Sequence, residues 1–490
     1  KIDEFNNQKN RNIKMVTIET SSDIIGNYEY TKRLMTNGIE ILYQPVLLNE
    51  SDNTFGCPDL LIRSDILNDF FENKYLEDDK ECSVDKVGFT YIVIDIKHSH
   101  LDFNSDEKTL RNTETIKPYK SQLCIYNNAL SQIQKYDHKI ALVLGKSYTI
   151  KGVKYYDYIN KLGIIDYGNR DNEYITKTKE AVDWIRRVRE EGKYWVLNPI
   201  PSVRELFPRM NNEKDGKWKD IKQKVSDNIG EITSVYYCGI KERKNAHSNS
   251  VYSWRDENCD SKSLGFSTDS RSKIPKTIDK ILKINRSNDV NVLPNRILTE
   301  KVESFNWRDS HINSVEFYLD FETMNSNFTE INGSISYDTI FIFQVGVGHI
   351  DLNGNWIYKS FISENRSKEG EKKLFENFFK HVNDVVNIRG VGANYHFVHW
   401  YPHEKICYDK LRASLNLPNI KFMDLSKLFR EEPIVIKGSL RFKLKSISKA
   451  LFKMGLIKTS WDLSSECNSG LAAMALANKL YLEAEINNVE

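Results

Sequence analysis

Cysteines are few in this 490-residue sequence, and no two of them form a C-x-x-C pair. The seven are scattered along the chain: Cys57, Cys82, Cys124, Cys238, Cys259, Cys407 and Cys467. An odd number without paired spacing argues against a disulfide framework, a zinc ribbon and a four-cysteine iron–sulfur cluster. We therefore expect a reduced, intracellular protein, located in the cytoplasm, the nucleus or, if the protein is viral, a viral factory.

Long apolar runs and a strong net charge are also missing. No run reaches the roughly 20 residues that a membrane-spanning helix needs, and the first residues do not resemble a signal peptide, so we expect neither membrane insertion nor secretion. The formal net charge is +2. The overall charge therefore neither indicates nor excludes a nucleic-acid partner, and any binding groove must be local. The chain begins with Lys1 rather than methionine, which indicates an internal fragment.

Apolar residues make up 40% of the chain, enough for packed cores, and the length is typical of two or three domains. We predict a nuclease-like core over 1–155, a mostly helical connecting region over 156–310 and a second regular domain over 311–490. In the first part, the patterns predict a helix up to Gly38, three strands, a helix after Pro118 and a further strand. The last part reads as three consecutive strands, "VEFYLDFE", "TIFIFQVGVGHI" and "NWIYKSFIS", then a helix and the strand "GVGANYHF". The expected fold class is α/β.

The apolar strand "YIVIDIK" ends in two opposite charges, Asp95 and Lys97. Alternate strand residues share a face, so these side chains point together. Upstream, "GCPDLLIR" places Asp59 at the start of a strand, and antiparallel pairing would bring it beside Asp95. Two carboxylates and the carbonyl oxygen of Ile96 would bind a hard cation such as Mg²⁺, with Mn²⁺ as a possible substitute. Lys97 would then stabilise charge on a phosphate or position a metal-bound water.

A D-x-K tripeptide alone is weak evidence, because this chain contains a second copy at Asp220–Lys222. No apolar strand precedes that copy, and we interpret it as a solvated helix face. Downstream of the first copy, Gln122 and Tyr126 in "QLCIY" are four residues apart and share a helix face. They could contact the phosphate or order Lys97, and the alternative is an ordinary semi-buried polar pair.

Together these pieces resemble the motifs of the PD-(D/E)XK nuclease superfamily, in its RecB-type, CRISPR-associated-exonuclease-like branch. The matching segments are Pro58–Asp59, Asp95–Lys97 and Gln122–Tyr126. The resemblance implies a restriction-endonuclease-like core in about the first 150 residues. It also implies the residue roles: metal ligands Asp59 and Asp95, catalytic Lys97, and supporting Gln122 and Tyr126.

The same family often adds an upstream acid or histidine to its site. Glu29 is the candidate and Glu40 its rival, although both are more often simple surface acids. Some members hold a four-cysteine iron–sulfur cluster. This chain lacks that cysteine pattern, so no cluster is expected.

A second acidic constellation lies in "YLDFET", where Asp320 and Glu322 share a strand face. Two carboxylates that close repel each other unless a cation lies between them. Farther along, Glu404 opens a predicted helix and "FMDLSKLF" contains Asp424. The pattern is similar to RNase H-like, DEDD-type 3′–5′ exonucleases, which implies that Asp320, Glu322 and Glu404 bind a metal pair and that Asp424 is a recurrent acid near the site. The family's last aspartate has no counterpart before Glu490, so we expect this domain to be truncated.

Three further residues, His399, His403 and Cys407, have the spacing of one helix face and offer a zinc site as an alternative. Pro402 falls among them and is expected to begin the helix. Histidines that frame the acidic pocket or simply pack are the preferred interpretation.

The sequence thus predicts a Mg²⁺-dependent DNA nuclease, with exonuclease action favoured over endonuclease action, in DNA repair, replication or defence against foreign DNA. Its partners would be single- or double-stranded DNA, a helicase, and further copies of the chain in a homodimer or higher oligomer. The alternatives are a catalytically weak nucleic-acid-binding scaffold and an RNA-directed nuclease, because no motif separates ribose from deoxyribose.

Overall fold

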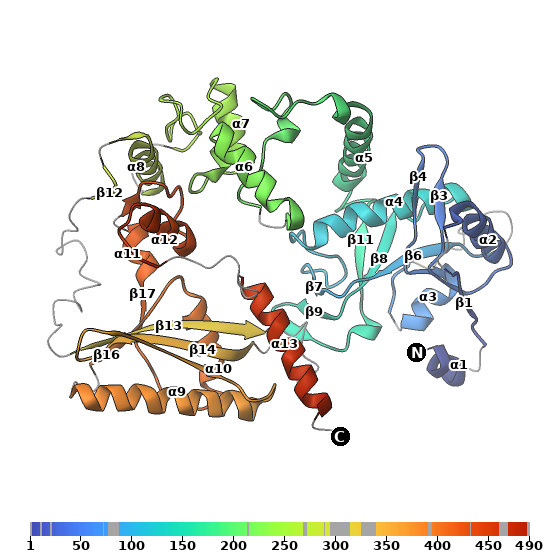
Figure 1. Cartoon of the computed structure of the whole chain (residues 1–490). Coiled ribbons are helices and arrows are strands. Elements are labelled where there is room, and N and C mark those ends of the chain that lie inside the picture. The colour runs from blue at the N-terminus through green and yellow to red at the C-terminus, as the bar shows by residue number, and fades with distance from the viewer. Residues whose placement is uncertain are drawn as a thin grey trace. The chain divides into compact units, whose positions relative to one another are not determined.

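The computed structural model forms two compact units, Lys1–Tyr194 and Trp195–Glu490, both with mixed α/β structure as predicted (Figure 1). The residues that it describes are 2–9, 12–19, 22–71, 73–76, 88–212, 215–267, 272–288, 290–294, 314–324, 340–390, 394–431, 433–459 and 469–487. The three-part division at residues 155 and 310 stays a prediction. Cys82 and Cys467 lie outside the described residues, and the other five cysteines are free thiols.

The first unit is built on a six-stranded mixed sheet in the order β1-β2-β5-β6-β8-β11. Its strands are β1 (Met15–Thr17), β2 (Ile41–Tyr43), β5 (Leu60–Arg63), β6 (Tyr91–Ile96), β8 (Ile140–Leu144) and β11 (Leu162–Asp166). The pairs β1–β2 and β6–β8 are parallel, and the other pairs are antiparallel. β6 contributes to a hydrophobic core on each side of the sheet, which explains why its sequence is an uninterrupted apolar run.

Helices cover both faces of this sheet, and two small sheets flank it. The helices are α1 (Ile2–Lys9), α2 (Ile24–Thr36), α3 (Ser64–Phe71), α4 (Ile116–Gln134) and α5 (Glu173–Glu191). The small sheets contain β3 (Leu47–Asn49) with β4 (Thr54–Gly56), and β7 (His100–Asp102) with β9 (Ser147–Ile150) and β10 (Val153–Tyr155). α4 packs against β6 through buried apolar residues such as Leu123 and Leu130, so the helix that carries the predicted polar pair lies next to the predicted acids.

Two features of the first unit differ from the sequence-based expectation or extend it. The prediction of a helix is wrong for Met15–Thr17. These residues form the edge strand β1, because parallel pairing with β2 outweighs the local preference for helix. α2 does end next to Gly38, as predicted, and that glycine has a φ of 69°. At the other edge of the sheet, β11 lies beyond the predicted domain boundary at residue 155.

A buried ion pair fixes the first half of α4. Lys120 and Asp171 are both 0% exposed, and the Lys120 Nζ lies 2.5 Å from Asp171 Oδ1. The same ammonium donates to the Leu110 carbonyl at 2.9 Å, and the other carboxylate oxygen accepts from the Asp166 backbone N–H at 3.0 Å. These contacts tie α4 to the segment that precedes α5.

The second unit begins with a helical part that contains α6 (Lys219–Ile229), α7 (Ile240–Ser248) and α8 (Ile274–Arg286). The second D-x-K copy lies on α6, as predicted. Asp220 is exposed, and Lys222 pairs with Asp215. This copy therefore lies on a helix and not at a strand end, but the prediction of a solvated face holds for Asp220 and not for Lys222, whose side chain is 15% exposed.

The rest of the second unit is organised by a five-stranded sheet in the order β15-β14-β13-β16-β17. These strands are β13 (Val315–Met324), β14 (Phe341–Ile350), β15 (Trp356–Ile362), β16 (Tyr395–His399) and β17 (Phe422–Asp424). The pairs β13–β14 and β14–β15 are antiparallel, whereas the pairs β13–β16 and β16–β17 are parallel. The first three predicted strands are confirmed. Of the predicted strand "GVGANYHF", residues 391–393 lie outside the described residues, and β16 begins at Tyr395. β17 is an additional strand.

Further helices belong to the second unit. They are α9 (Lys368–Arg389), α10 (His403–Arg412), α11 (Leu425–Glu431), α12 (Leu444–Lys453) and α13 (Gly470–Asn487), with a short pairing of β12 (Val292–Leu293) and β18 (Val435–Ile436). α9 runs along one face of the sheet (Figure 1) and packs Phe375 and Phe378 against Phe317, Val345 and Phe361. That face is therefore the core face.

Glu371 on α9 is a buried carboxyl within this core. It is 3% exposed, and its Oε1 accepts a hydrogen bond from the Ile342 backbone N–H at 2.7 Å. Burial raises its pKa from 4.5 to about 7. The folded state therefore binds the Glu371 proton more tightly than the unfolded state does. The free energy of unfolding carries no ionisation penalty below about pH 4.5, and it falls as the pH rises towards 7.

Replacing this carboxyl by an amide, Glu371→Gln, is expected to raise the free energy of unfolding at pH 8 by about 2 to 3 kcal/mol, because ionisation then costs nothing. The gain in the free energy of unfolding at pH 5 should be less than half as large. Urea unfolding at both pH values measures this gain, and the exposed neighbour Glu369→Gln is the control. An equal gain at both pH values would contradict the assignment.

Candidate functional site

The end of β6 brings together the two charges that the sequence singled out. Asp95 is 2% exposed, and its Oδ2 forms an ion pair with the Lys97 Nζ. This contact confirms that the two side chains share a face. Burial raises the pKa of the Asp95 carboxyl, and the Lys97 ammonium opposes that rise.

Asp59 lies beside Asp95, just before the neighbouring strand β5. The antiparallel register of β5 and β6 places the two aspartates opposite each other, and the charge of Asp59 raises the pKa of Asp95 further. The Asp59 Oδ1 accepts from Gln44 Nε2 at 2.8 Å, and its Oδ2 accepts from the Ile96 backbone N–H at 2.7 Å. Two neighbouring carboxylates repel each other when both are ionised, and a bound cation would relieve that repulsion.

α4 holds Lys97 from the other side. Gln122 Oε1 accepts from the Lys97 Nζ at 2.9 Å, and Gln122 Nε2 donates to the Tyr126 hydroxyl at 2.7 Å. Gln122 and Tyr126 thus share a helix face, as predicted. Burial raises the pKa of Tyr126, and the charges of Asp95 and Asp59 add to that rise, so the phenol stays neutral.

The tyrosine ring depends on a glycine for its position. A Cβ placed on Gly56 of β4 would lie 2.1 Å from Cε1 of Tyr126. Any side chain at residue 56 would therefore force the Tyr126 ring to move. Because Tyr126 contacts Gln122 and Gln122 contacts Lys97, Gly56 influences the position of the lysine.

Sequence reasoning missed Gln44 and Tyr119. Gln44 has a φ of 56°, uncommon for a residue with a side chain, and its backbone N–H also donates to the Asp59 carbonyl at 2.9 Å. The Tyr119 ring centroid lies 5.0 Å from the Lys97 Nζ. Tyr119 precedes Gln122 by three residues, a helical spacing that could have indicated it. No sequence signal marks Gln44.

The two candidates for an upstream acid make other contacts. Glu29 is exposed on α2 and pairs with Lys32 at 3.3 Å. Glu40 accepts from the Lys14 backbone N–H at 3.3 Å. These contacts do not include Asp59 or Asp95 and fit ordinary surface acids.

In the second unit, Asp320 and Glu322 share one face of β13, because Leu319 and Phe321 point into the core. Asp320 as a whole residue is exposed to solvent, but neighbouring groups partly shield its carboxyl from water. This desolvation raises the pKa of both carboxyls. The charge of Glu404 adds to the rise at Asp320, and Asp320 has the same effect on Glu322.

The two later acids have different surroundings. Glu404 is buried near the start of α10, and its Oε2 lies 3.3 Å from His399 Nδ1. Asp424 accepts through Oδ1 from the backbone N–H groups of Tyr401 and Ser426, each at 3.0 Å. Its Oδ2 lies 3.3 Å from Arg430. Asp424 therefore holds the start of α11 in place, and both of its oxygens are already engaged.

The predicted helix face of His399, His403 and Cys407 is wrong in one respect. His399 ends strand β16, so only the other two lie on α10, where His403 Nε2 is 3.6 Å from the Cys407 Sγ. Pro402 immediately precedes this helix, as expected. Strand pairing with β13 and β17 explains the difference.

Among the residues that the structure describes, no three His, Cys, Asp or Glu side chains converge closely enough to hold a metal ion. The first site offers the carboxylates of Asp59 and Asp95, with the backbone carbonyl of Ile96 nearby in sequence. Mg²⁺ usually keeps several waters and takes substrate phosphate oxygens as ligands, so two carboxylates can suffice. Burial and the neighbouring Asp59 charge raise the pKa of Asp95, and a bound cation would offset both effects.

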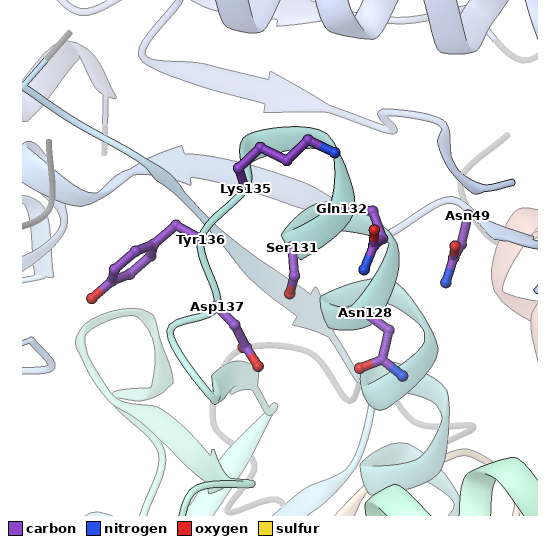
Figure 2. A pocket seen from close by; sticks show the side chains of 7 residues that line it. All are labelled: Asn49, Asn128, Ser131, Gln132, Lys135, Tyr136 and Asp137. Carbon is purple, nitrogen blue, oxygen red and sulfur yellow. The ribbon is translucent and has the colours of Figure 1, made fainter. Parts of the chain in front are cut away.

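A separate hollow of about 510 Å³ lies at the C-terminal end of α4 (Figure 2). Its lining is polar: Asn49, Asn128, Ser131, Gln132, Lys135, Tyr136 and Asp137. The lining includes none of the predicted site residues. Asp137 already accepts from Asn127 at 2.9 Å, so it serves to close the turn after α4.

Comparison with known proteins adds one match. The family described as "Domain of unknown function (DUF2779)" matches residues 317–440, about a quarter of the chain. The matching segment contains Asp320, Glu322, Glu404 and Asp424. A comparison with curated proteins found no match. Within the described part of the chain, no helix is both long and apolar enough to cross a bilayer.

Proposed function

We propose that the chain is a metal-dependent DNA nuclease whose hydrolytic site lies in the first unit and has a PD-(D/E)XK architecture. The observation that carries this proposal is the convergence of Asp59, Asp95 and Lys97 at neighbouring strand ends, with Gln122 of α4 holding the lysine. The mixed sheet flanked by α2 and α4 supports the same fold assignment.

Each side chain has a role that follows from its contacts. Asp59 and Asp95, with the Ile96 carbonyl, would hold Mg²⁺, which neutralises phosphate charge and lowers the pKa of a bound water. A lysine ammonium has three N–H donors; Gln122 accepts from one, and the same nitrogen forms an ion pair with Asp95. A remaining N–H can donate to a phosphate oxygen as negative charge develops there. Gln122 fixes the direction of that donor, because Tyr126 fixes Gln122.

The second unit supports an accessory role within the same proposal. Three antiparallel strands followed by two parallel ones, with Asp320 and Glu322 on the central strand, fit an RNase H-like, DEDD-type domain. Asp424 is paired with the Arg430 cation, whereas Asp59 accepts from the neutral donors Gln44 and the Ile96 N–H. Because Arg430 already offsets the Asp424 charge, we propose that this unit binds or guides a strand more than it cleaves one.

An end-labelled DNA assay tests the proposal and assigns the chemistry to a unit. Single- and double-stranded DNA would be incubated with the full chain in Mg²⁺, Mn²⁺ or EDTA, alongside Asp95→Asn and the double variant Asp320→Asn/Glu322→Gln. We expect cleavage that EDTA stops, an inactive Asp95→Asn and an active double variant. Loss of cleavage in the double variant alone would place the chemistry in the second unit. Binding without cleavage in every metal would replace the nuclease by a nucleic-acid-binding scaffold.

A further inference from the structure

The sheet face that carries Asp320 and Glu322 also carries large exposed aromatic side chains. Trp356 and Tyr358 on β15 are 53% and 61% exposed. They alternate along the strand, so they lie on one face, whereas Phe361 points to the core under α9. Burial in the core of the second unit therefore does not explain the two exposed rings.

Glycines on the neighbouring strand β14 let both rings lie against the sheet. A Cβ on Gly348 would be 2.1 Å from Trp356 Cζ2, and a Cβ on Gly346 would be 2.7 Å from the Tyr358 hydroxyl oxygen. The rings thus lean across the β14 backbone instead of standing upright. Tyr318 of β13 extends the row, with its ring centroid 5.5 Å from that of Trp356. We call Tyr318, Trp356 and Tyr358 the aromatic shelf.

The aromatic shelf leads directly to the acid pair. Gly346, which lies beneath the Tyr358 ring, is opposite Asp320 in the antiparallel register. Burial raises the pKa of Tyr358, and the charges of Asp320 and Glu322 add to it, which shows how near the phenol lies to both. Flat rings and a carboxylate pair are therefore neighbours on one surface.

We propose that the aromatic shelf binds single-stranded nucleic acid by stacking unpaired bases on Trp356 and Tyr358. Ring faces accept any base and bind it without sequence preference. Side chains two residues apart on a strand are about 6.6 Å apart, which suits an extended strand with successive unstacked bases. Duplex bases are already stacked and paired, so duplex DNA should bind poorly. The inference rests on the accessory role proposed for the second unit and names its ligand and residues, but it does not depend on the nuclease, because binding is expected without metal and without cleavage in the first unit.

Fluorescence anisotropy of the full chain in EDTA tests this site without any nuclease step. The probes are a fluorescein-labelled oligothymidine of twenty nucleotides, the matching oligouridine, an abasic strand of equal length and a duplex. The variants are Trp356→Ala, Tyr358→Ala and Trp356→Phe. The control is Trp218→Ala, which removes a tryptophan that is 63% exposed in the helical part of the second unit. Urea unfolding verifies that each variant is folded.

Each alanine substitution on the shelf should weaken oligothymidine binding about tenfold, the effect of losing one stacked base. Trp356→Phe should retain most of the affinity, and Trp218→Ala should leave it unchanged. The abasic strand should bind weakly and equally to all variants. A parallel loss for oligouridine extends the ligand to RNA, and the tighter of the two strands identifies the natural one. Unchanged oligothymidine binding in the two alanine variants, or an equal loss on the abasic strand, overturns the proposal.

Discussion

Lys97→Ala is expected to reduce the rate of DNA cleavage by about 100- to 1000-fold, the usual effect of removing one donor that stabilises transition-state charge. The reason lies in the contacts of this ammonium group. Asp95 and Gln122 orient it, and no other basic side chain makes these contacts among the described residues. Single-turnover cleavage of end-labelled DNA in Mg²⁺ would measure the loss.

The second D-x-K copy supplies a matched control for this substitution. Lys222→Ala removes the same residue type from the same tripeptide, but on helix α6, where Lys222 pairs with Asp215 in the second unit. We expect that variant to cleave DNA at the wild-type rate. Should Lys97→Ala keep full activity while remaining folded, the first unit would not be the hydrolytic one.

Lys120→Met is expected to cause the largest loss of stability, about 3 to 5 kcal/mol in the free energy of unfolding of the first unit. The substitution leaves Asp171 at 0% exposure without its cationic partner. A buried carboxylate cannot recover this energy from water. Urea unfolding followed by circular dichroism would measure the change.

Two further variants separate the buried pair from a general effect of mutating α4. Lys117→Met removes a lysine three residues earlier, whose pair with Glu114 is exposed, and should have no measurable effect. The double variant Lys120→Met/Asp171→Leu removes both charges and should recover much of the loss. If Lys120→Met unfolds no more easily than Lys117→Met, the buried pair does not hold α4.

The elements with strong periodicity could be predicted from the sequence, and the first site largely follows from them. The period of two in β6 places Asp95 and Lys97 together, and helical spacing places Gln122 beside Tyr126. Pairing of β5 with β6 then brings in Asp59. These inferences need only the geometry of regular elements, which local sequence determines.

Other features depend on contacts between distant segments, and sequence patterns do not reveal them. Lys120 and Asp171 are residue types usually found at the surface, and only packing shows that they are paired and fully buried. Gln44 reaches Asp59 because an unusual backbone conformation turns it there. β1 is too short, at three residues, for any alternation to be visible before its pairing with β2 is known.

The close approach of the Gly56 backbone to the Tyr126 ring has a consequence for how this protein can change by mutation. A residue without any functional group limits where an aromatic ring rests, and through Gln122 the ring influences the direction of the Lys97 ammonium. In a library that varies residue 56 and selects for DNA cleavage, we therefore expect glycine to dominate the survivors. Selection for cleavage would then preserve a glycine whose hydrogen side chain takes no part in the reaction.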